Sequence, residues 1–167
     1  PGTISLGQGI VYYGPPPSVH EKIKQFFEDP SLHSYQAVEG IPLLLDAIRN
    51  KLQKENQVSI SDDHQLVVTA GSNMAFSHAI NAIVDAGDEV ILFSPFYFNH
   101  EMAIELAGAK ALVLPVDANY LPDLNQLEAA ISPRTRAIVT VSPNNPTGKV
   151  YPKSLLTAIN QMCREKG

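Results

Sequence analysis

An asparagine-rich corner is the clearest place where side chains of this protein could do chemistry. Residues 142–149 read Ser-Pro-Asn-Asn-Pro-Thr-Gly-Lys and follow an apolar run, Ala137 to Val141, that is typical of a buried parallel strand. Open α/β sheets place ligands at the carboxyl ends of their strands. Pro146 favours an extended Asn145, and Gly148 allows a sharp turn. The pattern indicates a rigid corner that presents the Asn145 amide, although the same residue types also form ordinary turns.

A second polar segment, Thr-Ala-Gly-Ser-Asn at residues 69–73, lies between an expected strand and an expected helix. The N-terminus of a helix offers unpaired N–H groups and the positive end of a dipole, which suit an anionic phosphate. Gly71 would let that phosphate approach the backbone. The alternative is a plain helix cap made by Ser72 or Asn73, since both residue types favour that position.

Alternating strands and helices would position these segments from about residue 64 onward. The expected strands are Gln65–Thr69, Glu89–Phe93, Lys110–Pro115 and Ala137–Val141; the expected helices are Asn73–Ala86 with Gly87 as its stop, Tyr97–Leu106, one from Asp123, and one from Tyr151 to Gly167. This order predicts a three-layer α/β/α fold with a mostly parallel sheet of about four strands.

The residues before this region predict an extended lead-in and two short helices. Ser18 to Glu21 has the form of a capping box, and Pro42 suits the first turn of the second helix. We therefore expect an N-terminal extended segment with helices over residues 1–63 and an incomplete α/β domain over residues 64–167. Because so small a sheet would leave an unpaired edge, we expect the chain to be the front part of a longer protein.

Composition excludes several classes of function. A net charge of −5 over 167 residues argues against binding nucleic acid or an anionic membrane. No apolar run approaches the length of a membrane span, and the start of the sequence lacks the pattern of a signal peptide, so the cytoplasm is the expected location. Cys163 is the single cysteine, which excludes an internal disulfide or cysteine zinc site and favours a small packing residue. No metal site is expected.

Residues 142–148 resemble the Asn-Pro-Thr-Gly signature of class I/II pyridoxal-phosphate aminotransferases, which share the aspartate aminotransferase fold. Further segments are similar to that family's motifs in the same order and at about the same spacing: Leu6–Gly9, Tyr35–Pro42, Thr69–Asn73 and Ser94–His100. Together these segments cover nearly the whole chain. The resemblance implies the front part of the large cofactor-binding domain of that fold, with pyridoxal 5′-phosphate as cofactor.

The resemblance also implies roles for single residues toward the cofactor. Main-chain N–H groups of Ser72 and Asn73, beside Gly71, would hold the phosphate. Tyr97 would stack on the pyridine ring, because an aromatic face suits an electron-poor ring. Asn145 would donate a hydrogen bond to the phenolic oxygen and help keep it ionised. From its residue type alone, Tyr97 could equally be a core aromatic.

Other residues would act at the edges of the same site. By resemblance, His100 would orient an aspartate that pairs with the pyridine nitrogen. The alternative is a histidine at the surface or one whose hydrogen bonds are already satisfied, which is the more common case near a helix start. Gly9 and Asn145 would lie beside the substrate, and Tyr35 would reach the phosphate of a neighbouring subunit. The site would then require a homodimer.

The family's Schiff-base lysine lies well downstream of its Asn-Pro-Thr-Gly motif. None of the lysines here matches it: Lys22, Lys24, Lys51, Lys54, Lys110, Lys149, Lys153 and Lys166. We therefore expect that lysine to lie beyond Gly167, no catalytic residue in this chain, and no activity from the 167 residues alone.

The expected activity of the complete protein is the transfer of an amino group from an amino acid to a 2-oxo acid. A pyridoxal-phosphate lyase or synthase of the same fold is an alternative, because the same front motifs serve those reactions. A non-catalytic α/β binding module is another. The absence of a Gly-x-Gly-x-x-Gly or Walker loop argues against a nucleotide ligand.

Overall fold

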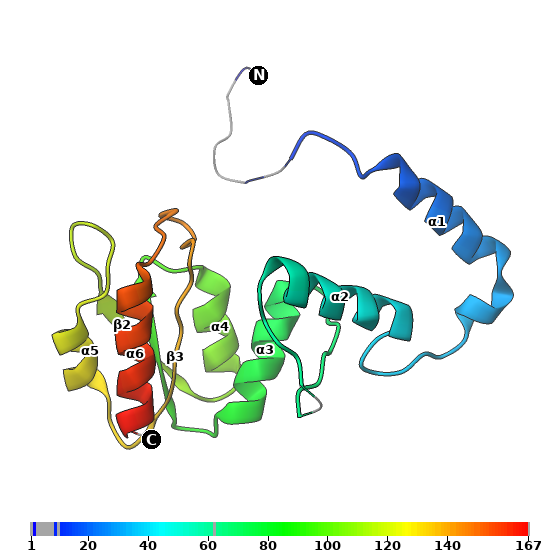
Figure 1. Ribbon diagram of the computed structural model, residues 1–167. Coiled ribbons are helices and arrows are strands. Elements are labelled where there is room, and N and C mark those ends of the chain that lie inside the picture. The colour runs from blue at the N-terminus through cyan, green and yellow to red at the C-terminus, as the bar shows by residue number, and fades with distance from the viewer. Residues whose placement is uncertain (1, 3–8, 10, 62, 167) are drawn as a thin grey trace. The chain divides into compact units, whose positions relative to one another are not determined.

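The computed structural model describes residues 2, 9, 11–61 and 63–166. The chain divides into two compact units, Pro1–Val67 and Val68–Gly167. The second unit contains the sheet and the loops that follow its strands (Figure 1). Within the described ranges, none of the helices is long and apolar enough to cross a membrane.

The first unit contains α1 (Pro17–Glu28), the 3₁₀ helix η1 (Pro30–His33) and α2 (Pro42–Glu55). Pro42 opens α2 as expected, because its fixed φ suits the first helical position. The expected capping box in α1 is wrong. Pro17 takes the first helical position and Pro16 becomes the N-cap, so Ser18 lies inside the helix and no side chain caps it.

The second unit is built around three parallel strands: β1 (Glu89–Ser94), β2 (Lys110–Pro115) and β3 (Thr135–Ile138). They lie in the order β2-β1-β3, with β1 paired in parallel to both neighbours. β1 is buried on both faces, which explains its continuous apolar sequence, Val-Ile-Leu-Phe at residues 90–93. The predicted strands Glu89–Phe93 and Lys110–Pro115 are confirmed.

Helices cover both faces of the sheet: α3 (Ser72–Ile83) and α4 (Phe98–Leu106) on one, α5 (Leu124–Ala130) and α6 (Lys153–Lys166) on the other (Figure 1). Successive residues of β1 alternate between the two cores. Val90 and Leu92 pack with α3 and α4, whereas Ile91 and Phe93 pack with α5 and α6. Each such side chain contributes about 1.5–3 kcal/mol by leaving water. The three-layer α/β/α fold with a parallel sheet is thereby confirmed.

Three predicted elements differ from the structure. Gln65–Thr69 forms no strand, because a strand needs a hydrogen-bonded neighbour and no described residue pairs with it, so the sheet has three strands. α3 ends at Ile83 instead of Ala86, because Val84 turns extended and enters the core. β3 begins earlier than expected and ends at Ile138, although the Val139 N–H still donates to the Ile91 carbonyl at 2.9 Å.

The remaining predicted helices are present, and they begin slightly later than expected. α4 begins one residue after Tyr97, and the Asp123 side chain caps α5 by accepting from the N–H groups of Asn125 and Gln126. α6 begins at Lys153 instead of the predicted Tyr151, whose N–H donates to Ser142 Oγ at 2.9 Å, and it extends to Lys166. The last predicted residue of that helix, Gly167, lies outside the described residues.

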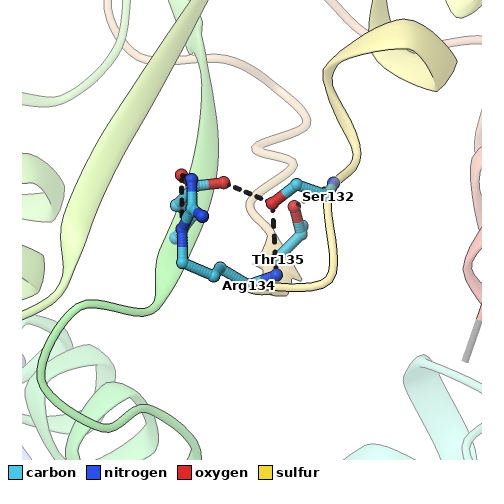
Figure 2. Close-up of polar contacts among 4 residues, drawn as sticks. Ser132, Arg134 and Thr135 are labelled. Carbon is cyan, nitrogen blue, oxygen red and sulfur yellow. Dashed lines mark hydrogen bonds and ion pairs between the residues drawn. The ribbon is translucent and has the colours of Figure 1, made fainter.

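A network around Glu89 ties the amino end of β1 to the segment that leads into β3 (Figure 2). Ser132 Oγ donates to one carboxylate oxygen of Glu89 at 2.7 Å, and Arg134 donates to the other through Nε at 3.1 Å and Nη2 at 2.7 Å. The hydrogen bond from Ser132, followed by those from Arg134, lowers the pKa of the Glu89 carboxyl. The ionised carboxylate is therefore the form that holds this end of the sheet.

We predict that Glu89→Gln lowers the melting temperature of the chain by several degrees at pH 7. The folded pKa lies below the unfolded value of about 4.3, so the stabilisation is present above that pH and is lost as the pH falls through the folded pKa. The difference from wild type should therefore shrink between about pH 5 and pH 3. Thermal melts followed by circular dichroism check this, with the exposed Glu105→Gln as matched control. A difference that stays constant with pH would contradict it.

We predict that Leu127→Ala lowers the free energy of unfolding by about 2–5 kcal/mol. Leu127 is 0% exposed and joins α5 to Ile91 and Phe93 of β1, so truncation leaves a cavity in that core. Leu106→Ala, at a position that is 86% exposed, should change the value by no more than about 0.5 kcal/mol. Urea unfolding of both variants measures the contrast, and equal effects would rule it out.

Candidate functional site

The loops that carry the predicted site residues leave the same edge of the sheet. β1 ends at Ser94 and continues through Tyr97 into α4, whereas β3 ends at Ile138 and continues into residues 142–149. Because β1 and β3 are parallel, their carboxyl ends lie together. The amino-terminal halves of α3 and α4 also meet, since the rings of Phe76 in α3 and His100 in α4 lie 4.2 Å apart between centroids.

The first turn of α3 offers main-chain N–H groups that no side chain caps. Its N-cap is Gly71, with φ 85° and ψ 169°, and the first helical hydrogen bond runs from the Ala75 N–H to the Gly71 carbonyl at 3.2 Å. The N–H groups of Ser72, Asn73 and Met74 precede that bond. This geometry decides against the plain-cap interpretation, because Ser72 and Asn73 lie inside the helix and their side chains do not cap it.

Hydrogen bonds of Asn144 stabilise the corner at residues 142–149. Its side-chain oxygen accepts from the N–H and the hydroxyl of Thr147 at 3.1 and 2.8 Å, and its backbone bonds to Lys149 and Gly148 at 2.8 and 2.7 Å. Gly148 adopts φ 71°, which supplies the expected sharp turn. Asn144 is buried, whereas Asn145 is exposed. The corner therefore fixes the backbone of Asn145 while leaving its side-chain amide in solvent.

Tyr97 and His100 belong to one aromatic cluster at the start of α4. Their rings meet edge to face, 5.6 Å apart and at 87°. Asn99 donates from Nδ2 to the Tyr97 hydroxyl at 2.9 Å. Both rings are half-buried, so neither is a simple core or surface residue.

His100 carries an orphaned polar atom. Its Nδ1 is buried and has no hydrogen-bond partner among the described residues. Burial lowers the pKa of the imidazole, which favours the neutral ring. Because buried polar atoms in folded proteins nearly always have partners, this nitrogen is a candidate contact for a group other than the described residues.

The structure thus brings most predicted site residues to one edge of the second unit: Gly71, Ser72, Asn73, Tyr97, His100 and Asn145. Gly9 and Tyr35 belong to the first unit, where both are exposed. The neighbours Leu6 to Gln8 in the glycine motif lie outside the described residues.

Sequence reasoning missed three residues that support this edge: Phe76, Asn99 and Asn144. The role of Asn144 could have been predicted, because asparagine side chains commonly form hydrogen bonds with the backbone of their own turn. Phe76 fits the apolar pattern of a helix, but that pattern does not predict which residue the Phe76 ring contacts. Nothing in the local sequence indicates that Asn99 bonds the Tyr97 hydroxyl.

Comparison with known proteins gives relatives that are named as aminotransferases. The aromatic aminotransferase ISS1 of Arabidopsis thaliana is 38% identical over 169 residues, covering 98% of this chain and 42% of that protein. Human kynurenine–oxoglutarate transaminase 3 is 32% identical, covering 98% of this chain and 38% of its own length. This chain thus spans about two fifths of the length of these relatives.

Solved structures agree with the sequence comparison. A variant of the aspartate aminotransferase of Thermus thermophilus matches with a TM-score of 0.87 and 33% identity, covering 95% of this chain and 44% of that one. The family described as aminotransferase class I and II matches residues 1–167. The motifs, the three-layer fold and these matches agree, and the chain belongs to the class I and II aminotransferase family.

Proposed function

We propose that this protein acts in the transfer of an amino group from an amino acid to a 2-oxo acid, with pyridoxal 5′-phosphate as cofactor. Family membership supports the reaction class. The observation that carries the proposal is the convergence at one sheet edge of uncapped N–H groups, an aromatic cluster and an exposed amide. These groups match the three chemically different parts of the cofactor: its phosphate, its ring and its phenolic oxygen.

The residues present fit the phosphate. The uncapped first turn of α3 presents the N–H groups of Ser72 and Asn73, and a helix N-terminus attracts an anion. A Cβ built at Gly71 would meet no atom of the described residues within 4 Å, apart from its neighbours along the chain. The space there is therefore open to a ligand, while the positive φ of Gly71 still favours glycine.

The ring and its oxygen would be held by the neighbouring residues. Tyr97 would stack on the pyridine ring and exclude water from one face of it. Asn145 would donate to the phenolic oxygen and favour its ionised form. His100, neutral because it is buried, would orient a carboxylate that pairs with the ring nitrogen. When bound, the cofactor supplies the electron sink for the reaction at the substrate Cα.

Two further parts of the reaction are the proton transfer at Cα and the binding of the substrate. None of its lysines matches the family's cofactor-binding lysine, so we assign the base at Cα to no residue here. We propose that Gly9 lies beside the substrate and that Tyr35 reaches the phosphate of a partner subunit in a homodimer. Both roles rest on the motif resemblance.

We predict that Gly71→Ala weakens binding of pyridoxal phosphate roughly tenfold to a hundredfold in the natural full-length protein. A Cβ is disfavoured at φ 85°, and shifting this residue would displace N–H donors whose bonds to a charged phosphate are worth about 1.5–3 kcal/mol each. Equilibrium dialysis measures the dissociation constant. Pyridoxal, which lacks the phosphate, should bind wild type and variant alike.

Gly87→Ala is the matched control for that experiment. Gly87 has a similar φ of 91° and open space around it, but it precedes the amino end of β1 instead of facing the loops at the carboxyl end. It should lose stability without losing affinity for the phosphate form. If Gly71→Ala weakened both ligands equally, the phosphate assignment would fail.

We predict that Asn145→Ala shifts the acid-to-base transition of the bound cofactor's absorbance upward by about one to two pH units. The ionised oxygen would lose a hydrogen bond worth about 1.5–3 kcal/mol, and 1.36 kcal/mol corresponds to one unit. Spectrophotometric titration of the holoenzyme checks the shift. Asn160→Ala, an exposed position on α6, should leave the titration unchanged. An unshifted Asn145→Ala titration would refute the role.

A further inference from the structure

Asn99 holds the hydroxyl of the aromatic residue that faces the proposed cofactor edge. Its Nδ2 lies 2.9 Å from the Tyr97 oxygen, and this is the one side-chain hydrogen bond of Asn99 among the described residues. The contact spans two residues at the start of α4, where Tyr97 is the N-cap. We propose that Asn99 is a positioning residue that fixes the plane of the Tyr97 ring for stacking, an inference that rests on the proposed function.

The local structure gives Asn99 no competing role. No side chain caps α4, so the amide is not used to satisfy the first turn of its helix. Asn99 is partly buried in a depression that it lines with Asn73, Ser77, Met102, Ala103 and Leu106. In that setting the Tyr97 hydroxyl is the partner that orients the amide.

The hydrogen bond completes a two-point hold on the Tyr97 ring. At one point the ring meets two other rings: His100 edge to face, 5.6 Å away, and Phe98 in a tilted arrangement, 5.1 Å away. At the other, the Asn99 amide fixes the hydroxyl. A tyrosine ring has only two side-chain torsions, so two contacts determine its plane. A phenylalanine at this position would keep the first contact and lose the second.

The hold also connects the ring to the phosphate end of α3. His100 lies against Phe76, with ring centroids 4.2 Å apart and planes at 35°. Phe76 is in the second turn of α3, which begins at Ser72. A line of contacts therefore runs from Asn99 through Tyr97, His100 and Phe76 to the helix that would bind the phosphate. The spacing between ring and phosphate positions is built into the protein before any ligand arrives.

A double-mutant cycle in the natural full-length protein tests the inference. Asn99→Ala, Tyr97→Phe and the double variant are compared for the dissociation constant of pyridoxal phosphate and for the visible circular dichroism of the bound cofactor, which reports how the ring is held. Each single variant should weaken binding roughly threefold to tenfold and reduce the dichroism per bound cofactor. The double variant should be no weaker than either, because both changes break the same bond.

The controls separate this inference from the proposed function. Asn160→Ala, an exposed asparagine on α6, should match wild type in both measurements. Binding that responds to Asn145→Ala but not to Asn99→Ala, or additive effects in the cycle, would overturn the role of Asn99 alone. A wild-type protein that does not bind pyridoxal phosphate would overturn both. Melting curves check that each variant is folded. If Asn99→Ala does not fold, Tyr97→Phe still tests the hydrogen bond, because it removes the hydroxyl and keeps the ring.

Discussion

The burial of β1 between two helical layers is the constraint on which the rest of the second unit depends. Val90 to Phe93 are at most 3% exposed, and their side chains alternate between the two cores. A strand buried on both faces has its direction and register fixed by packing. Since β3 is paired in parallel to it, the loops after both strands leave the same edge. The topology of the sheet thus places the candidate site residues of both loops at that edge.

The two ends of β1 are chemically opposite. At the amino end, the carboxylate of Glu89 accepts hydrogen bonds from Ser132 Oγ and from Nε and Nη2 of Arg134. Both carboxylate oxygens therefore have hydrogen-bond partners. At the carboxyl end, the first turn of α3 is uncapped and the Nδ1 of His100 lacks a partner among the described residues. Unsatisfied buried groups are uncommon in folded proteins. The buried His100 nitrogen and the exposed N–H groups of α3 support our proposal that the carboxyl end of β1 is the edge that binds a ligand.

The sequence was sufficient where local signals and burial agree. β1 and β2 are apolar runs flanked by turn residues, and Asp123 caps its helix through a side chain that favours that position. Predictions failed where a contact with residues distant in the sequence determines the local structure. Gln65–Thr69 has strand composition but no described neighbour, and Val84 leaves its helix because the core holds it. The contacts of Phe76 and Asn99 depend on side-chain geometry, which spacing along the chain does not contain.

The two adjacent asparagines of the corner, Asn144 and Asn145, are protected from deamidation in different ways. Asparagine deamidates when the backbone nitrogen of the next residue attacks its side chain, and that attack needs an N–H. Pro146 has none, so this route is closed to Asn145. Asn144 is followed by a residue with an N–H, but its side-chain oxygen is held by two hydrogen bonds from Thr147 and the residue is buried. The missing N–H of Pro146 thus protects the exposed amide of Asn145 from this reaction. Burial and hydrogen bonding protect the amide of Asn144.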